Sequence, residues 1–310
     1  MLLASGPAAV EAQGGAWQWQ NPLPTGNTLF GVWGSSADDV YAVGAAGTLL
    51  HYDGMAWSLI GSGTTESLLG VWGSGTSDVF AVGWVGTIVH YDGTAWTAMS
   101  SGTADALWGV WGTGADDVYA VGASGTILHY DGDGWSAMSS GTTNALNGVW
   151  GSSAGDVYAV GDGGIILHYD GADWSPMSSG MMGPLFGVWG SGANDVYAVD
   201  SSGTVLHYDG VDWSPTGSGT TVTLRAVWGS SGSGVYAVGA PGPFSPGIMV
   251  HYDGAAWSEM PCGVGHELRG VGGSSASDVF AVGQGGAILH YGGAAMYPVY
   301  LPLVLDGGTP

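Results

Sequence analysis

A tetrapeptide that returns at nearly regular intervals constrains the fold of this chain more than any other feature of its sequence. The first copy is Gly-Val-Trp-Gly at Gly31–Gly34, and later copies begin at Gly70, Gly109, Gly148, Gly187, Ala226 and Gly270. The first five steps are 39 residues each, and the sixth is 44 because of extra residues in Pro241–Gly247. Seven such units with a period of about 40 predict a propeller or a solenoid, in which each unit is one supersecondary element.

Each unit contains four short apolar runs that are separated by turn-forming residues. In the second unit these runs are Leu68–Trp72, Val79–Val82, Thr87–Tyr91 and Trp96–Met99. The runs are rich in β-branched and aromatic residues and are bounded by Gly, Asp and Ser, which is typical of antiparallel strands. No segment has an apolar period of helical type. The sequence therefore predicts an all-β propeller with seven blades of four antiparallel strands.

The two ends of the array indicate that the propeller is a closed ring. A Trp opens the fourth run of every complete unit, at Trp57, Trp96, Trp135, Trp174, Trp213 and Trp257. The last unit has Met296 there, whereas Trp17–Gln20 stands alone before the first unit. We expect this N-terminal segment to close the seventh blade and to cover its exposed edge. The alternative is a closing strand at Met296–Leu301.

These units resemble the blades of two known groups of proteins. Asp156–Trp174 is similar to photosystem II stability/assembly factor-like propellers and to the Asp-box repeats of bacterial neuraminidases. Trp19–Pro24 resembles the opening strand of the same group, and the likeness covers about Trp17 to Tyr291. An Asp box has one more residue between its Asp and Trp, and Ser or Thr in place of His168. The resemblance implies a propeller fold and, for the first group, a role as an assembly chaperone.

Residues that repeat in all or all but one of the units are interpreted as scaffold. An Asp-Gly pair such as Asp53-Gly54 marks the third turn of the first six units, where the Asp side chain and a Gly with positive φ build the turn. A second Asp, such as Asp39, precedes the second strand, and a His, such as His51, recurs in the third. Because a catalytic His is normally one residue, we expect a structural His–Asp or His–backbone contact. The repeated Trp33-type residues are expected to pack between blades.

Composition excludes several classes of function. The chain has 2 Lys or Arg residues against 25 Asp or Glu residues, so its formal net charge is −23. This balance is incompatible with a nucleic-acid surface or with attachment to anionic lipids. A sialidase would need three arginines, and Glu66, Asp105 and Cys262 lie in no recognisable catalytic motif. We therefore predict a non-enzymatic protein that uses no cofactor and no metal.

Positions that vary between units identify a candidate binding face. The residue after the Leu that opens each first strand is Phe30, Leu69, Trp108, Asn147, Phe186, Arg225 or Arg269. Both arginines of the chain occupy this position, and Trp84, His266 and Glu267 are expected on the same face. We predict a ligand site centred on the two arginines, with both side chains at the surface, so that replacing them leaves folding nearly intact. The alternative is neutral drift at a solvent-exposed entrance.

The leading functional hypothesis is a secreted or surface-located binding or adhesion module that recognises a protein or a glycan. The alternatives are an assembly-factor-like chaperone and a polysaccharide-acting hydrolase. Residues 1–15 resemble a truncated signal peptide, residues 16–296 form the expected propeller, and residues 297–310 form an apolar tail. That tail is too short to cross a bilayer, so no membrane insertion is expected. The acid excess favours an extracellular or cell-surface location.

Overall fold

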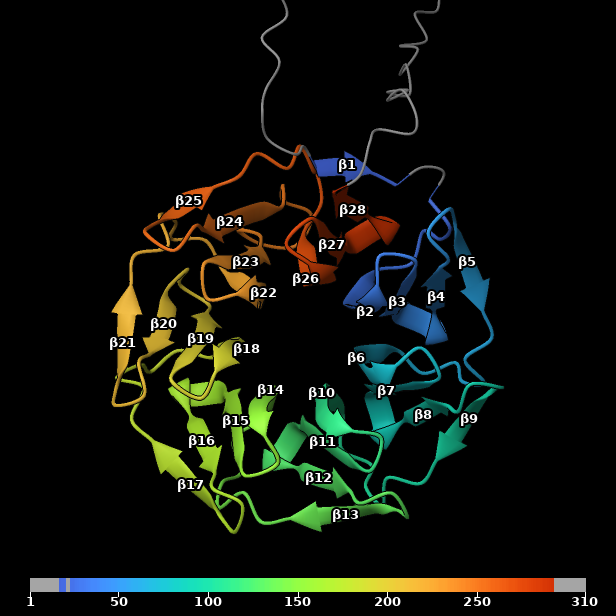
Figure 1. Cartoon of the computed structure of the whole chain (residues 1–310), viewed down its shortest axis with the longest axis horizontal. Helices are drawn as coiled ribbons and strands as arrows, with labels where there is room; N and C mark the ends of the chain where they lie inside the picture. Colours follow the sequence, from blue (N-terminus) through green and yellow to red (C-terminus); the bar gives the residue numbers. More distant parts are fainter. Residues whose placement is uncertain (1–16, 21–22, 293–310) are drawn as a thin grey trace, which may run out of the picture.

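The computed structural model describes residues 17–20 and 23–292 of the chain. These residues form seven four-stranded antiparallel sheets arranged around a central axis (Figure 1). The predicted all-β, seven-bladed propeller is therefore confirmed. The segments 1–15 and 297–310, and the alternative closing strand at 296–301, lie outside the described residues. Within the described ranges, no helix has the length and hydropathy that a bilayer crossing requires.

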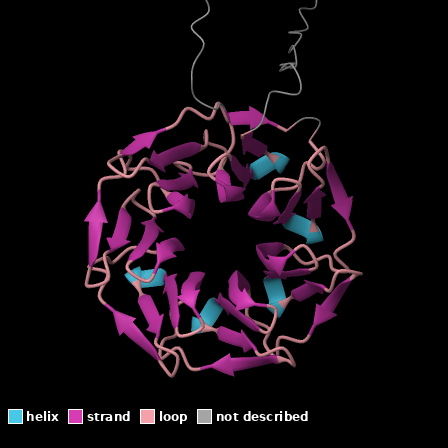
Figure 2. Ribbon diagram, in the orientation of Figure 1, coloured by secondary structure: helices cyan, strands magenta, loops and turns pink. Residues whose placement is uncertain are grey.

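The strands fall into four concentric positions, with the first strand of each blade nearest the axis (Figures 1 and 2). The first strands are β2 (Leu29–Ser36), β6 (Leu68–Gly75), β10 (Leu107–Gly114), β14 (Leu146–Ser153), β18 (Leu185–Gly192), β22 (Leu224–Ser231) and β26 (Leu268–Ser275). The second strands are β3 (Asp39–Gly44), β7 (Asp78–Gly83), β11 (Asp117–Gly122), β15 (Asp156–Gly161), β19 (Asp195–Asp200), β23 (Gly234–Gly239) and β27 (Asp278–Gly283). The third strands are β4 (Leu49–Tyr52), β8 (Ile88–Tyr91), β12 (Ile127–Tyr130), β16 (Ile166–Tyr169), β20 (Val205–Tyr208), β24 (Ile248–Tyr252) and β28 (Ile288–Tyr291).

The fourth strands form the outer wall, and they are β5 (Trp57–Ile60), β9 (Trp96–Met99), β13 (Trp135–Met138), β17 (Trp174–Met177), β21 (Trp213–Thr216), β25 (Trp257–Glu259) and β1 (Trp17–Trp19). Short 3-10 turns follow the second strand at η1 (Ala45–Gly47), η2 (Trp84–Gly86), η3 (Ala123–Gly125), η4 (Asp162–Gly164) and η5 (Gln284–Gly286).

The apolar core lies between blades. Each cluster of buried side chains takes members from two neighbouring sheets, as where Phe80 and Val82 of β7 meet Leu107 and Val118 of the next blade. Second strands are buried on both faces because they lie in the middle of this stack, which explains their unbroken apolar pattern of Val-Tyr-Ala-Val or Val-Phe-Ala-Val. A single blade has no partner for its apolar faces, so the ring is the folding unit.

The repeated Trp and Gly of the first strands fit together across blades. A Cβ atom added at Gly112 would lie 2.8 Å from Cη2 of Trp72 in the preceding blade, and the same contact joins Gly151 to Trp111. The predicted packing of these Trp residues between blades is therefore confirmed. In the last blade Gly272 replaces the Trp, and a Cβ there would lie 2.5 Å from the carbonyl oxygen of Val32.

The N-terminal strand closes the ring, as predicted. β1 pairs antiparallel with β28, with Trp17 opposite Tyr291, and Trp57 and Tyr52 hold the same register in the first blade. The Trp17 ring also lies edge-on to Tyr236 of the preceding blade, with centroids 6.1 Å apart. Every other outer Trp makes the equivalent contact, so the N-terminal segment completes both the hydrogen bonding and the aromatic packing of the seventh blade.

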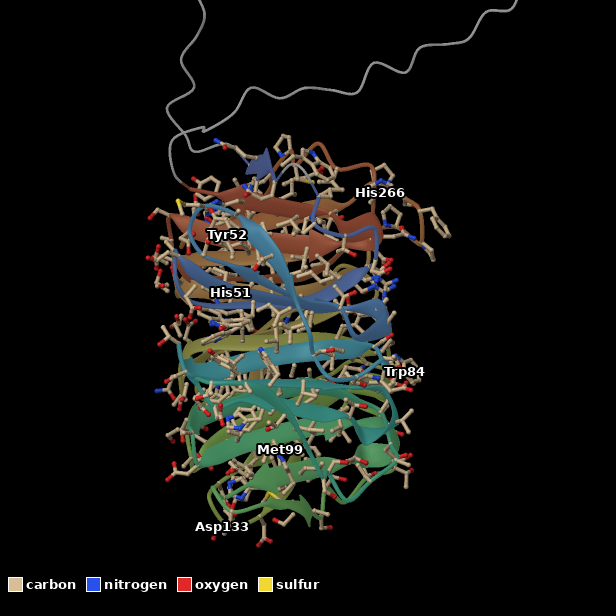
Figure 3. The ribbon with its side chains drawn as sticks, turned by 90° about the vertical axis from the view of Figure 1, so that its right-hand side faces the viewer. His51, Tyr52, Trp84, Met99, Asp133 and His266 are labelled. Atoms are coloured by element: carbon tan, nitrogen blue, oxygen red, sulfur yellow. The ribbon has the colours of Figure 1, made fainter. Side chains whose placement is uncertain are left out.

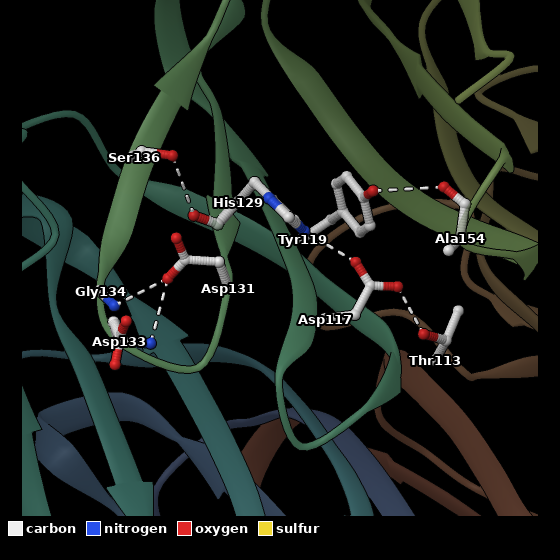
Figure 4. A network of polar contacts seen from close by, with 9 residues as sticks. All are labelled: Thr113, Asp117, Tyr119, His129, Asp131, Asp133, Gly134, Ser136 and Ala154. Carbon is white, nitrogen blue, oxygen red and sulfur yellow. Dashed lines mark hydrogen bonds and ion pairs between the residues drawn. The ribbon is translucent and has the colours of Figure 1, made fainter. Parts of the chain in front are cut away.

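The repeated His and Asp bond to each other on one face of the ring. In the third blade His129 Nε2 lies 2.7 Å from Asp117 Oδ1, and Thr113 Oγ1 donates to the other carboxylate oxygen (Figure 4). The same 2.7 Å pair joins His51 to Asp39, His90 to Asp78, His168 to Asp156, His207 to Asp195 and His290 to Asp278. The predicted structural His–Asp contact is therefore confirmed. In the sixth blade Gly234 occupies the Asp position, and burial lowers the pKa of His251.

The Asp-Gly pairs build the third turns. Asp131 Oδ1 accepts hydrogen bonds from the backbone N–H groups of Asp133 and Gly134, at 3.0 and 3.1 Å (Figure 4). Gly132, which follows Asp131, has a φ of +92°, a backbone conformation that is costly for any residue with a side chain. The two backbone N–H groups lower the pKa of Asp131 by stabilising its carboxylate. The equivalent Asp53, Asp92, Asp170, Asp209 and Asp253 also have lowered pKa values, from the same cause.

These turns are expected to make the protein sensitive to acid. Their Asp pKa values lie below the usual value of 3.8, so the folded state binds protons less readily than the unfolded chain. The stability that they contribute is present above about pH 4 and is lost as pH falls through the folded pKa values. Urea unfolding across a pH series measures this, and Asp131→Asn keeps the acceptor oxygen but removes one titrating group. An unchanged acid slope in that variant would contradict the assignment.

Candidate functional site

The two faces of the ring differ in chemistry. The first and third turns of each blade share one face, because a Cβ at Gly54 of the third turn would touch Asp38 of the first. The second turns share the opposite face with the loops between blades, since the backbone N–H of Ala45 donates to Thr28 O at 2.9 Å. We call these the acidic face and the mouth face. Figure 3 shows Trp84 and His266 on the mouth face, with Tyr52 and Asp133 toward the other side.

The channel along the axis opens on the mouth face. Its walls are the first strands, which approach closely because glycine stands at most of the contacts. A Cβ at Gly270, for instance, would lie 2.7 Å from the carbonyl oxygen of Phe30 in the next blade. A cavity of about 200 Å³ in this channel is lined by five predicted site residues, namely Phe30, Trp108, Phe186, Arg225 and Arg269. In five of the seven blades, the variable position therefore lines the mouth of the channel.

The two arginines meet at one buried carboxylate. Arg225 Nε lies 2.9 Å from Glu267 Oε1, and Arg269 Nη2 lies 2.6 Å from Glu267 Oε2. The Glu267 side chain is 0% exposed, whereas the arginines keep 29% and 31% of their side-chain surface. Equivalent positions in the other blades hold Thr28, Ser67, Ala106, Ala145, Pro184 and Thr223. The seventh blade thus places an acid where the others carry short or compact side chains.

The ion cluster argues against the expectation that both arginines can be replaced with little effect on folding. Their guanidinium groups are half-buried and neutralise a carboxylate that has no access to water. Removing Arg225 and Arg269 together would leave Glu267 charged, buried and unpaired, which costs several kcal/mol in typical cases, roughly 3–5. Any test of the site must therefore change Glu267 together with the arginines.

Aromatic rings extend this cluster on both sides. The guanidinium carbon of Arg225 lies 5.0 Å from the centroid of the Phe186 ring, and that of Arg269 lies 5.4 Å from Phe30. Both distances suit cation–π contact. Phe186, Arg225, Arg269 and Phe30 belong to four consecutive blades, so they form a continuous row along part of the mouth. We call this row, together with Glu267, the arginine row.

The other predicted residues lie apart from this row. Asn147 donates from Nδ2 to Leu185 O at 2.8 Å and to Asp162 Oδ1 at 3.1 Å, so its amide joins two blades. Trp84 is 49% exposed on η2, away from the cavity lining. His266 is exposed on the loop before β26. Trp108 reaches the cavity from the third blade. Whether any of these residues binds a ligand stays a prediction.

Two residues of this region escaped the sequence analysis. Phe244 lies in the insertion of the sixth blade and is 81% exposed. Gln284 on η5 accepts a hydrogen bond from the Phe244 backbone N–H at 3.2 Å. For Phe244, the available signal was the extra residues at Pro241–Gly247, which lengthen the sixth repeat. Gln284 had no such signal, because the residue that begins this turn varies between blades, being Ala in three of them and Trp, Asp, Ser or Gln in the others.

The geometry of the repeated polar groups does not suit nucleophilic catalysis. In a Ser–His–Asp triad the imidazole stands between hydroxyl and carboxylate and removes the hydroxyl proton. Here Asp39 stands in the middle, accepting from Ser35 Oγ at 2.5 Å and bonding His51 on its other oxygen. Burial also raises the pKa of the Cys262 thiol, which leaves it a poor nucleophile. No cluster of His, Cys, Asp and Glu that could hold a metal occurs among the described residues.

Comparison with known proteins places the chain by its fold. No protein-family model and no curated protein matches it. Among solved structures, YCF48 bound to D1 peptide is 16% identical with a TM-score of 0.72, covering 93% of this chain and 100% of that one. YCF48 from Cyanidioschyzon merolae is 17% identical with a TM-score of 0.69, covering 89% and 99%. The WD40 β-propeller domain of Doa1 is 11% identical with a TM-score of 0.74, covering 89% and 97%.

The likeness is one of fold. It confirms the resemblance to photosystem II assembly factor-like propellers in the arrangement of seven blades. Because the identities are below 20%, the residues of a binding site are not carried over from these proteins.

Proposed function

We propose that this chain is a protein-binding propeller without catalytic activity, and that the arginine row recognises an acidic segment of its partner. The observation that carries the proposal is the convergence of both arginines of the chain at the channel mouth. Two guanidinium groups and one carboxylate leave one local positive charge in a protein with a net charge of −23. A carboxylate on a partner is attracted to this point and repelled by the acidic face.

Unused hydrogen-bonding capacity supports the same proposal. Among the described residues, Glu267 accepts one hydrogen bond from each arginine, and no further acceptor is found for either guanidinium group. Arg269 Nε is buried and unpaired, so it is not one of the N–H groups that a partner can reach. Arginine can bind a carboxylate through two parallel N–H groups, which gives geometric specificity. Phe30 and Phe186 hold the guanidinium groups in place, so less conformational entropy is lost on binding.

The comparisons support a protein as the ligand, since one structural neighbour is YCF48 bound to D1 peptide. We favour a protein over a glycan for this reason and because a neutral sugar offers no charge to the arginines. A role in the assembly of another protein is one form of this activity. We further propose an extracellular or cell-surface location, which fractionation of the producing cells would test.

The arginine row is tested with a variant that removes its charges together. Arg225→Met, Glu267→Leu and Arg269→Met in one chain leave no buried charge unpaired, and such apolar replacements are often neutral for stability. Peptides are first selected on the wild-type protein from a displayed random library. We expect Asp and Glu to be enriched in them, and binding to the triple variant to weaken by about 10-fold to 150-fold, since a charged hydrogen bond contributes about 1.5–3 kcal/mol.

Salt provides an independent check, because attraction between exposed charges weakens as ionic strength rises. Unchanged binding by the triple variant, at a retained melting temperature, would remove the arginine row from the site. Selection of no peptides, together with saturable binding on a glycan array, would instead show that the ligand is a carbohydrate.

A further inference from the structure

The insertion of the sixth blade presents a single aromatic side chain to solvent. The insertion carries Phe244 between Pro243 and Ser245 in the loop from β23 to β24. Phe244 is 81% exposed, and its φ of +63° lies in the left-handed region that bulky residues rarely adopt. Both features cost free energy in the isolated protein, because water contacts the ring and the backbone is strained. A Gly at this position would avoid both costs.

The base of this loop is firmly held. The backbone N–H of Gly247 donates to Val264 O at 3.1 Å, and Cys262 Sγ lies 3.4 Å from Gly247 O. Val264 and Met249 belong to the apolar core beside β26 and β27. Near the tip, the N–H of Ser245 donates to Gly242 O at 3.2 Å and closes a tight turn. The loop therefore presents Phe244 from an anchored base.

A chain of hydrogen bonds connects Phe244 to the arginine row. The backbone N–H of Phe244 donates to Gln284 Oε1 at 3.2 Å, and the backbone N–H of Gln284 donates to Glu267 O at 2.9 Å. The carboxylate of Glu267 then holds both arginines. The exposed ring and the two guanidinium groups thus belong to one sector of the mouth face, on the sixth and seventh blades.

We infer that Phe244 is an apolar docking residue for the same partner whose acidic segment the arginine row binds. This inference rests on the proposed function and adds the chemistry of the partner, which carries a large apolar side chain close to a carboxylate. Aromatic residues at the centre of an interface commonly dominate its binding energy, because they bury a large area with few rotatable bonds. Net charge distinguishes the possible occupants, because a second copy of this chain or an anionic lipid surface would bring many negative charges against a chain whose net charge is −23, whereas a partner with one carboxylate beside its apolar side chain meets the arginines.

The test uses peptides selected from a displayed random library on the wild-type protein. We expect enriched sequences to contain a Phe, Trp, Leu or Met near an Asp or Glu. Phe244→Ala should weaken their binding at least about tenfold, as is usual for a truncated aromatic anchor. Met182→Ala is the matched control, because Met182 is 92% exposed on the loop before β18 of the fifth blade, outside the insertion, and it should change nothing. Gln284→Ala keeps the ring but removes its tether and should cause a smaller loss.

The outcomes separate this inference from the proposed function. Peptides that lose binding when the arginine row is replaced, but bind Phe244→Ala normally, would overturn the docking role of Phe244 and leave the proposed function standing. Peptides that depend on neither would overturn both. Equal losses in Phe244→Ala and Met182→Ala would also count against the inference. Self-association of the wild-type protein that Phe244→Ala abolishes would identify a second copy as the occupant and overturn the choice of partner.

Discussion

Removal of residues 1–20 is expected to lower the thermal unfolding midpoint of this propeller by about 10 °C or more. The deletion takes away β1, whose Trp17 and Trp19 pack against the core cluster beside β27. Truncation of one buried large aromatic typically costs about 3–5 kcal/mol, and two half-buried Trp residues together should cost at least as much. The loss also exposes β28 as an unpaired edge, which promotes aggregation.

Deletion of residues 1–15 is the matched control, because it leaves β1 whole and should preserve the melting temperature. Trp17→Ala isolates the contact with Tyr236 and should give an intermediate effect. Calorimetry or circular dichroism measures all three proteins. If the longer deletion melts like the wild type while a deletion of residues 296–310 does not, the ring closes through its C-terminal segment instead.

Replacement of Glu267 by Ala is expected to destabilise the fold by about 2–4 kcal/mol. Removing one member of a fully buried ion cluster typically costs about 3–5 kcal/mol, because the remaining charges are left without partners. The cost here should be lower, since Arg225 and Arg269 keep about 30% of their surface in water and hydration relieves part of their repulsion. Urea unfolding of the variant measures this difference directly.

The triple variant Arg225→Met, Glu267→Leu and Arg269→Met distinguishes the cause. If the loss in Glu267→Ala comes from unpaired charge, the triple variant should recover most of the stability, since no charge remains in the cluster. If it comes from an empty cavity instead, Glu267→Gln should be nearly as stable as the wild type. A Glu267→Ala protein with unchanged stability would show that the cluster contributes nothing to the fold.

Most of the fold could be predicted from the sequence because each blade repeats the same strands, turns and packing residues. The period, the alternation of strands and turns, and the Trp at the start of each fourth strand are all one-dimensional features. The Trp at position 17 favoured the N-terminal segment as the closing strand, and the structure confirms it by pairing Trp17 with Tyr291. The His–Asp pairs were predictable for a related reason, because the two residues are 12 positions apart in every blade that has both.

The candidate site was predicted in position but not in structure. Periodicity placed Arg225 and Arg269 at equivalent points of neighbouring blades, and both do line the channel mouth. It gave no indication that Glu267 turns inward between them, because the side chain at that position is short or compact in the other six blades. The arginines therefore hold each other through a buried acid, and the cluster has a structural role beside the binding role that we propose.

The sequence by itself determined the class of fold and the number of blades, and it favoured the N-terminal strand over Met296–Leu301 as the strand that closes the ring. These follow from hydrogen bonding and packing between residues in the same or adjacent repeats, so they recur whenever the pattern recurs. Only the tertiary structure decided which of the residues that depart from the repeat contact one another. Arg225 and Glu267 are 42 residues apart, and Phe244 and Gln284 are 40 apart. Neither pair follows from the period, because the rotation between blades and the path of one insertion set these contacts.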